Sequence, residues 1–188
     1  MATYTVGQSG GPTYDYSTLD AAFGGASVTD IEIQGTWSVD DTAFVTADVA
    51  VSVTCDSDSH NPGYISSTCY RLRTTAEGTS ASITVTADCT FDGIAVENTR
   101  TDTSDECFRV DADAITLTVK NCVGGFTSQN DQQDFIYVDN QATPTVIVEQ
   151  CHVWNVDRAL VDIYRTASTT SNVTINSVHC YNFGDGHR

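Results

Sequence analysis

Carboxylates dominate the chemistry that this sequence can offer. Its 188 residues include 25 acidic side chains but only 8 basic ones. Hydrolysis of a glycosidic bond needs two carboxyl groups, about 5–5.5 Å apart in retaining enzymes and about 6.5–9.5 Å apart in inverting ones. Stacked repeats could bring together Asp139 with Asp162, or Asp113 with Asp139. Polysaccharide cleavage is therefore one hypothesis for the function.

A polysaccharide lyase would also need a basic side chain near the proton that it abstracts. The chain offers Arg109, Lys120, Arg158 and Arg165. The densest acid–base cluster contains Asp157, Arg158, Asp162 and Arg165. Surface ion pairs explain this cluster more simply, because among 20 aspartates some must lie near a basic residue by chance. Such surface pairs contribute little to stability. We therefore assign no catalytic, cofactor-binding or metal-ligating residue from the sequence.

The seven cysteines fit buried structural positions better than a metal site. Five of them recur at a spacing near 30 residues and are expected to form one inward-facing ladder: Cys55, Cys89, Cys122, Cys151 and Cys180. A zinc site usually contains close pairs such as C-x2-C, and none occurs. Free cysteine packs as a small buried hydrophobe. A disulfide between Cys69 and Cys107 is an alternative, because they occupy equivalent points of adjacent repeats.

A polar loop carries Asp56 and Asp58 two residues apart, followed by His60. This spacing is similar to the start of a calcium loop, but the glycine and the distal glutamate of an EF-hand are missing. We expect a solvated surface loop here.

The elements that must position these residues repeat along the chain. Four segments can be superimposed, each with alternating apolar residues before a cysteine: ITVTADCTF from Ile83, ITLTVKNCVGGF from Ile115, TVIVEQCHVWNV from Thr145 and NVTINSVHCYNF from Asn172. A second series lies between them: CYRLRTT from Cys69, CFRVDAD from Cys107, DFIYVDNQ from Asp134 and LVDIYRTA from Leu160. A period near 30 residues indicates a solenoid or a propeller.

The alternation of apolar residues selects a β architecture. It rules out helical repeats, which need a 3.6-residue period, and the Val, Ile, Thr, Tyr and Phe content suits strands. The signatures of leucine-rich and WD40 repeats are absent. We therefore predict an all-β, single-stranded parallel β-helix of about five coils, with coils about 4.8 Å apart.

The N-terminal segment predicts a cap for this solenoid. A short strand ends at Gly7, and Ser17 is a plausible N-cap for a short helix that stops at Gly24-Gly25. A strand through Ile31 and Ile33 follows. This strand–helix–strand opening resembles that of the pectin-lyase-like superfamily of right-handed parallel β-helices. The resemblance implies that the helix covers the end of the core, as solenoid termini require.

We expect a single domain spanning residues 1–188. Residues 1–27 would form the N-terminal strand and helix cap, residues 28–183 the coils, and residues 184–188 a tail. No helix follows the last repeat. Its open end would be covered by another subunit, by a neighbouring protein, or by Phe183 and the tail folding over it.

Enzymes of this superfamily include pectate lyases, polygalacturonases and pectin methylesterases. The polygalacturonase set of catalytic motifs is absent as a constellation, because Asp40-Asp41 has no companions nearby and Gly186-His187 reverses the required order. About five coils would give a solenoid roughly 25 Å long. Polysaccharide-cleaving β-helices are typically about twice that length, and the fold alone does not imply function.

The strong negative charge restricts the partners. With a net charge of −17 and a single lysine, the protein should repel nucleic acid and anionic membranes. Neither a secretory signal nor an apolar run of about 18 residues is visible, so we expect no membrane insertion. Abundant aspartate with almost no lysine resembles proteins of halophilic archaea and their viruses.

Composition and fold type together resemble the capsid decoration or turret proteins of tailed viruses that infect halophilic archaea. The resemblance implies a non-enzymatic structural virion protein on the capsid surface, assembled in the host cytoplasm as a homo-oligomer. Its partners would be the capsid protein and a host surface glycan or glycoprotein; no cofactor is expected.

Two alternatives have other functions. One is a carbohydrate-active tail spike, or an enzyme similar to polysaccharide lyases and hydrolases. The other is a carbohydrate-binding β-helix without chemistry, in which aromatic residues stack on sugars: Tyr4, Tyr14, Tyr16, Trp37 and Trp154.

Overall fold

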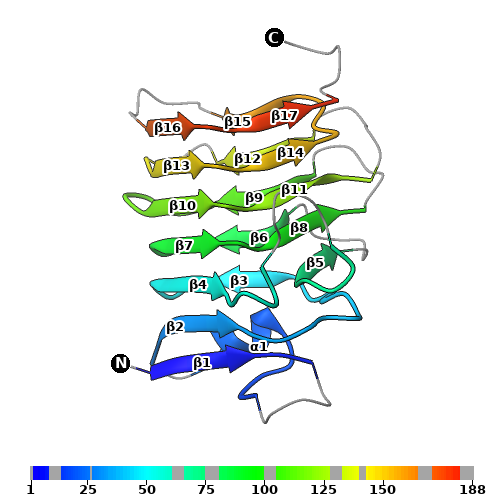
Figure 1. Ribbon diagram of the computed structural model, residues 1–188. Coiled ribbons are helices and arrows are strands. Elements are labelled where there is room, and N and C mark those ends of the chain that lie inside the picture. The colour runs from blue at the N-terminus through cyan, green and yellow to red at the C-terminus, as the bar shows by residue number, and fades with distance from the viewer. Residues whose placement is uncertain are drawn as a thin grey trace.

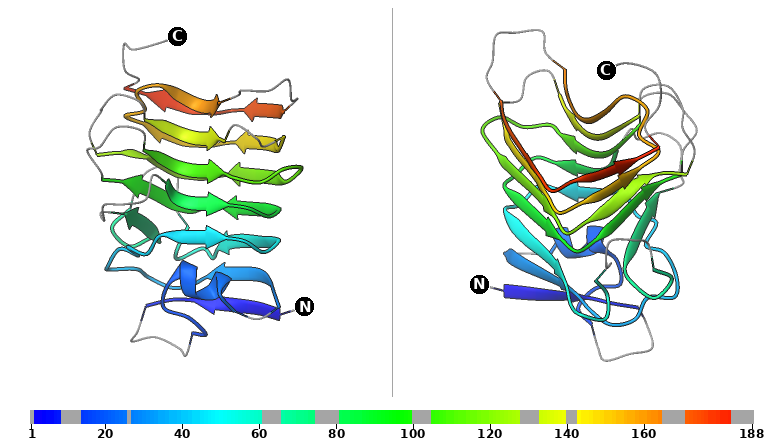
Figure 2. Two further views of the ribbon diagram at one scale, coloured as in Figure 1. Left: turned by 180° about the vertical axis from the view of Figure 1, so that it is seen from behind. Right: turned by 45° about the horizontal axis from the view of Figure 1, so that its top comes forward.

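The protein is a right-handed parallel β-solenoid of about five coils, which confirms the predicted fold class (Figures 1 and 2). The computed structural model describes residues 2–8, 14–25, 27–60, 66–74, 81–99, 105–127, 133–139, 143–164 and 171–182. In these ranges the chain forms 17 strands and one short helix. No helix in this described part is long and apolar enough to cross a membrane.

Three parallel sheets surround the core. Sheet A contains, in spatial order, β1 (Ala2–Val6), β2 (Val28–Ile33), β4 (Val51–Cys55), β7 (Cys89–Asp92), β10 (Thr116–Lys120), β13 (Thr145–Glu149) and β16 (Asn172–Asn176). Sheet B contains β5 (Arg71–Thr74), β8 (Ala95–Asn98), β11 (Val123–Phe126), β14 (His152–Trp154) and β17 (His179–Tyr181). Sheet C contains β3 (Val45–Ala47), β6 (Ala81–Val85), β9 (Glu106–Val110), β12 (Asp134–Val138) and β15 (Ala159–Ile163).

Each coil visits sheets A, B and C in turn, and each strand pairs in parallel with the equivalent strand one coil away. The first coil is incomplete, because an isolated bridge between Asp41 and Leu72 replaces its sheet B strand. Parallel pairing in register stacks residues of one column directly above one another. The side chains of every column are therefore neighbours across coils.

Alternation along the strands builds the core. One inward column of sheet A comprises Ile31, Val53, Phe91, Val119 and Val148, and all five are fully buried. Aromatic rings fill the space between sheets, with Phe108 packed on Phe91 and Phe135 at ring-centroid distances of 5.4 and 5.5 Å. Burial of such side chains supplies the main stabilising free energy of the solenoid.

The cap helix, α1 (Leu19–Phe23), lies at the N-terminal end of the solenoid (Figure 1). Its N-cap is Thr18, so the prediction of Ser17 was wrong by one residue. The Thr18 hydroxyl accepts a hydrogen bond from the Ala21 amide at 3.2 Å, whereas Ser17 caps nothing. The helix ends at Gly24 and buries Leu19, Ala22 and Phe23, as predicted.

The repeat segments were superimposed incorrectly in two places. ITVTADCTF runs from sheet C into sheet A, whereas the three later segments of that series begin in sheet A. CYRLRTT contains β5 of sheet B, whereas the other three members of the second series contribute to sheet C. Apolar alternation identifies a strand but not the sheet to which it belongs. Because the connections between strands differ in length from coil to coil, the superposition of the sequence segments placed strands of different sheets together.

The single five-cysteine ladder was therefore also wrong. Cys122 and Cys151 occupy equivalent corners between sheets A and B, but Cys89 begins β7 and Cys180 lies within β17. All seven cysteines are free thiols.

The alternative of a disulfide between Cys69 and Cys107 is also wrong. Their thiols donate hydrogen bonds to the carbonyls of His60 and Gly125 respectively. Four of the seven are buried, so the expectation of structural thiols holds for these.

Close stacking of β11 on β14 gives a test of the coil geometry. A Cβ atom on Gly125 would lie 2.0 Å from the carbonyl oxygen of Trp154, whereas one on Gly24 would lie 3.6 Å from its nearest neighbour. We expect Gly125→Ala to lower the free energy of unfolding by about 2 kcal/mol, because the coils must separate locally and because the φ of +154° at Gly125 strains a residue with a Cβ atom. Gly24→Ala, the matched control, should change it by less than about 0.5 kcal/mol. Urea unfolding curves measure both, and equal effects would contradict the stacking geometry.

Candidate functional site

The basic residues of the described chain all bridge adjacent coils. There are five of them: Arg71, Arg73, Arg109, Lys120 and Arg158. Lys120 contacts Asp92 of the preceding coil at 3.2 Å, and Arg73 contacts Glu97 of the following coil at 3.0 Å. The other three also meet carboxylates of neighbouring coils. The few cations thus lie where stacking brings carboxylates together.

The densest group lies on the outer face of sheet C, and we call it the sheet C cluster. It consists of Arg109, Asp134, Tyr137, Asp139, Arg158 and Asp162. In-register pairing places Tyr137 between Arg109 and Asp162 on neighbouring strands. Arg109, Tyr137 and Asp162 occupy one outward column of these strands, whereas Asp134, Asp139 and Arg158 lie at or just beyond the strand ends.

Arginines flank the tyrosine ring of this cluster. The guanidinium carbons of Arg109 and Arg158 lie 5.4 and 5.9 Å from the ring centroid of Tyr137. Both distances fall within the range of cation–π attraction. Tyr164, which is 51 % exposed, stacks on Tyr137 at 6.4 Å. The surface is thus aromatic as well as charged.

Arg158 holds two carboxylates at once. Its Nε lies 3.1 Å from both carboxylate oxygens of Asp134, its Nη2 also contacts Asp134, and the same Nη2 lies 2.6 Å from Asp162. The Asp134 side chain is fully buried, while those of Arg158 and Asp162 are about one-third exposed. Burial raises the pKa of Asp134 to about 6, although Arg158 opposes this shift. Asp134 is therefore mostly ionised and paired at neutral pH.

The carboxylates that were predicted to pair with each other interact with other groups in the structure. Asp139 and Asp162 belong to the same cluster, but Asp139 pairs with Arg109 while Asp162 pairs with Arg158. Asp113 accepts a hydrogen bond from the Thr143 amide at 3.1 Å. In the predicted acid–base cluster, Arg158 and Asp162 are indeed paired, Asp157 lies beside Arg158 in the turn before β15, and Arg165 lies outside the described residues.

Sequence reasoning missed Asp134 and Tyr137, the centre of the cluster. The signal was present in the spacing, because Arg109, Tyr137 and Asp162 follow one another at about one repeat length. Reading it required the correct register of sheet C, which the misaligned second series obscured. The cluster links the coils, and each of its three carboxylates is paired with an arginine.

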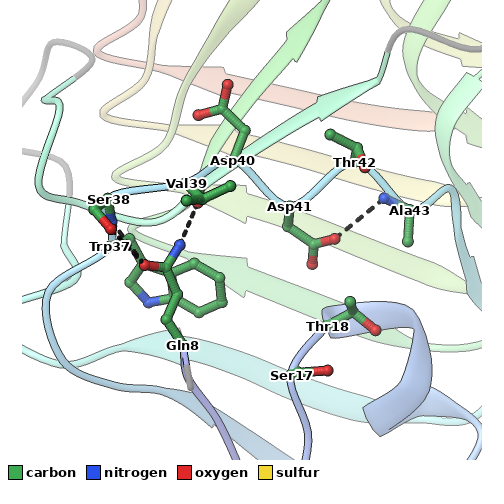
Figure 3. Close-up of a pocket in the computed structure, with 10 residues that line it drawn as sticks. All are labelled: Gln8, Ser17, Thr18, Trp37, Ser38, Val39, Asp40, Asp41, Thr42 and Ala43. Atoms are coloured by element: carbon green, nitrogen blue, oxygen red, sulfur yellow. Dashed lines mark hydrogen bonds between the residues drawn. The ribbon is translucent and has the colours of Figure 1, made fainter. Parts of the chain in front are cut away.

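A second feature is a cavity of about 470 Å³ between the start of α1 and residues 37–43. Figure 3 shows its lining side chains, which are Gln8, Ser17, Thr18, Trp37, Ser38, Val39, Asp40, Asp41, Thr42 and Ala43. Gln8 closes one side, where its side-chain oxygen accepts a hydrogen bond from the Ser38 amide at 2.8 Å. We call this the cap pocket.

Asp41 of the cap pocket has a structural role. Its carboxylate accepts hydrogen bonds from the Leu19 amide at 2.8 Å, the Ala43 amide at 3.1 Å and the Tyr70 hydroxyl at 3.1 Å. Burial raises the pKa of Asp41, although these hydrogen bonds act in the opposite direction. The residue ties the cap helix to the first coils.

The neighbouring Asp40 does not form an acid pair with Asp41. Figure 3 shows its carboxyl group directed away from that of Asp41, and it binds Arg71 and Arg73. Glycoside hydrolysis would need two carboxyl groups that both point into the pocket and flank the scissile bond. The cap pocket therefore lacks that arrangement.

The Asp56 loop is built by its own hydrogen bonds. Asp56 accepts from the amides of Gly35, Asp58 and Ser59 at 2.8–3.0 Å. Although burial alone would raise it, these bonds and the Ser59 hydroxyl lower the pKa of Asp56. Throughout the described ranges, no three His, Cys, Asp or Glu side chains gather as a metal site.

The predicted sugar-stacking aromatics lie in different surroundings. Trp37 is only 3 % exposed and packs edge-on against Tyr70, so it belongs to the core. Tyr4 and Tyr16 pack edge-on against each other. Trp154 stacks on Tyr181 at 6.3 Å on the outer face of sheet B. This last pair remains available as a surface platform.

Comparison with known proteins gives no further assignment: no protein-family model, no curated protein and no solved structure matches the chain.

The buried carboxyl of Asp134 predicts a pH dependence of stability. An unfolded aspartate has a pKa near 3.9, and that of Asp134 in the folded protein is about 6. Between about pH 4 and pH 6 the folded state holds a proton that the unfolded state releases, so this group makes stability fall as pH rises. The contribution is on the order of 2 kcal/mol across that window.

Replacing this carboxyl isolates its contribution. Asp134→Asn should remove that part of the slope when urea unfolding is measured from pH 4 to pH 7. Other titrating groups affect both proteins equally, so the difference between the two curves reports Asp134. Parallel curves for the wild type and the variant would show that Asp134 titrates normally.

Proposed function

We propose that this protein is a non-enzymatic structural module of a virion, a decoration or turret protein displayed on the capsid of a virus that infects a halophilic host. The observation that carries the proposal is the use of the basic side chains. All five in the described ranges join carboxylates across coils, which makes the solenoid stiff rather than reactive.

The carboxylates that could catalyse a reaction are engaged in the same way. Asp139 and Asp162 are the best-placed pair, and each contacts an arginine. A general acid or nucleophile must be free to exchange a proton or to attack. A role in holding coils together explains these residues without any reaction.

The charge supports a setting at high salt. A net charge of −17 on a small solenoid opposes compaction through self-repulsion. Near-molar salt reduces the Debye length to about 3 Å and removes most of that repulsion. A rigid acidic module exposed to brine would bind the capsid protein at one end and present its loops to a host glycan or glycoprotein.

Carbohydrate binding without chemistry is a second candidate, favoured by the exposed aromatic stacks. Tyr137 with Tyr164, and Trp154 with Tyr181, form stacked ring pairs on sheets C and B. Tyr and Trp combine an apolar ring with a polar group and are enriched at binding surfaces. This function is compatible with display on a particle.

Counting copies in purified particles tests the virion role. Quantitative mass spectrometry of virus from a high-salt host that produces this chain should find on the order of hundreds of copies per particle, as expected for a symmetric surface component. A handful of copies would indicate a tail spike. Absence from the particle would contradict the proposal.

Variants separate the spike enzyme from the structural module. Particles are incubated with host-surface glycan, and Asp139→Asn and Asp162→Asn are compared with the wild type. We expect no depolymerisation by any of the three. Cleavage by the wild type that either substitution abolishes would establish the enzyme instead.

A further inference from the structure

The last described coil exposes residues whose equivalents are buried elsewhere. Val173 and Ile175 of β16 are 38 % and 52 % exposed. Their register partners on β13, Val146 and Val148, are fully buried because β16 covers them. These side chains continue the core columns into an exposed apolar face on the last coil, which we call the terminal face. Figure 2 shows the backbone of that coil.

The backbone at this face is also open on one side. β15, β16 and β17 are the last strands of sheets C, A and B, and none pairs with a further described strand. Open strand edges of this kind are templates for pairing with another chain. The terminal face thus offers both apolar side chains and hydrogen-bonding groups.

In a strongly acidic protein, β16 and β17 of the terminal face carry no Asp, Glu, Lys or Arg, and Asp162 of β15 is paired with Arg158. Residues 171–182 contain no Asp, Glu, Lys or Arg, and the uncharged run in the sequence extends from Thr166 to Gly184. By contrast, each of the four preceding coils (β4–β6, β7–β9, β10–β12 and β13–β15) has at least one charged residue in its strands. Two chains of charge −17 repel each other, so a surface that joins them must be free of carboxylates. β16 and β17, which carry the exposed apolar side chains of this face, meet that condition.

The opposite end of the solenoid cannot serve as its complement. There α1 covers the core with Leu19, Ala22 and Phe23, all buried. A head-to-tail stack would bring the apolar terminal face against this covered end, where Tyr16 already pairs with the outer edge of β1. Matching apolar surfaces are obtained only when two terminal faces meet.

We propose that two copies of this protein associate through their terminal faces about a two-fold axis perpendicular to the solenoid. Coils that face each other in this way run in opposite directions. A two-fold axis through the middle of β16 pairs β16 with its own copy in an antiparallel ladder. The same rotation places β15 of one protomer beside β17 of its partner.

Such an interface is isologous and closed, so it produces dimers and no filament. It covers Val173 and Ile175 of both copies and supplies partners for the open strand edges. The inference does not rest on the virion role, because it follows only from burial, pairing and charge at this face.

Analytical ultracentrifugation in about 3 M KCl, where repulsion is screened, tests the proposal. The wild type at micromolar concentration should sediment as a dimer. Ile175→Asp introduces two buried, unpaired carboxylates, one per protomer, and should weaken association by about 100-fold or more. Val39→Asp is the matched control, because Val39 is a 68 % exposed apolar residue remote from the terminal face. It should leave the dimer intact.

Cys180 provides an independent readout on the native sequence. It is an exposed thiol on β17, beside the expected position of the partner's strand. A maleimide should label it more slowly in the wild-type dimer than in Ile175→Asp, with circular dichroism showing that both are folded. A monomer, a head-to-tail polymer, or a dimer that Ile175→Asp does not weaken would each overturn the proposal. The first of these results would indicate that another protein or a further coil covers the face.

Discussion

In-register stacking of parallel coils is the constraint on which the rest of this structure depends. It continues each apolar column through the core, and it equally places every outward side chain about 4.8 Å from its equivalents above and below. In an acidic chain this geometry would bring carboxylates into rows. Lys120 beside Asp92, and Arg158 between Asp134 and Asp162, interrupt such rows with the few cations available.

The same constraint explains why carboxylates gather on the outer surface of the solenoid. Close acid pairs are unavoidable on stacked coils, and the structure neutralises the densest ones with arginine. Where a carboxylate is buried without an ion pair, as at Asp41, amides and the Tyr70 hydroxyl satisfy it. Most of these contacts are partly exposed, and each such ion pair contributes about 1 kcal/mol or less. Their combined effect is to oppose separation of neighbouring coils.

The sequence predicted the architecture because apolar alternation and a period near 30 residues both follow from stacked strands. It could not assign strands to sheets, since all three sheets share the same alternation. Cys89 illustrates the problem: its spacing from Cys122 matches the repeat, yet the two residues lie at different points of the coil. The sheet C cluster was missed for the same reason, because Tyr137 joins Arg109 and Asp162 only in the correct register. The exposure of Ile175 likewise depends on which strand lies above it.

We propose that stacking holds together a polyanion whose own cations are too few, and that salt supplies the remaining screening. The most direct test is the free energy of unfolding as a function of KCl concentration, with sucrose as an uncharged osmolyte for comparison. Repulsion among 25 carboxylates should outweigh the attraction of the ion pairs, so stability should rise steeply between about 0.1 and 3 M KCl as the Debye length shortens. Stability that stayed constant or fell with KCl would contradict the claim.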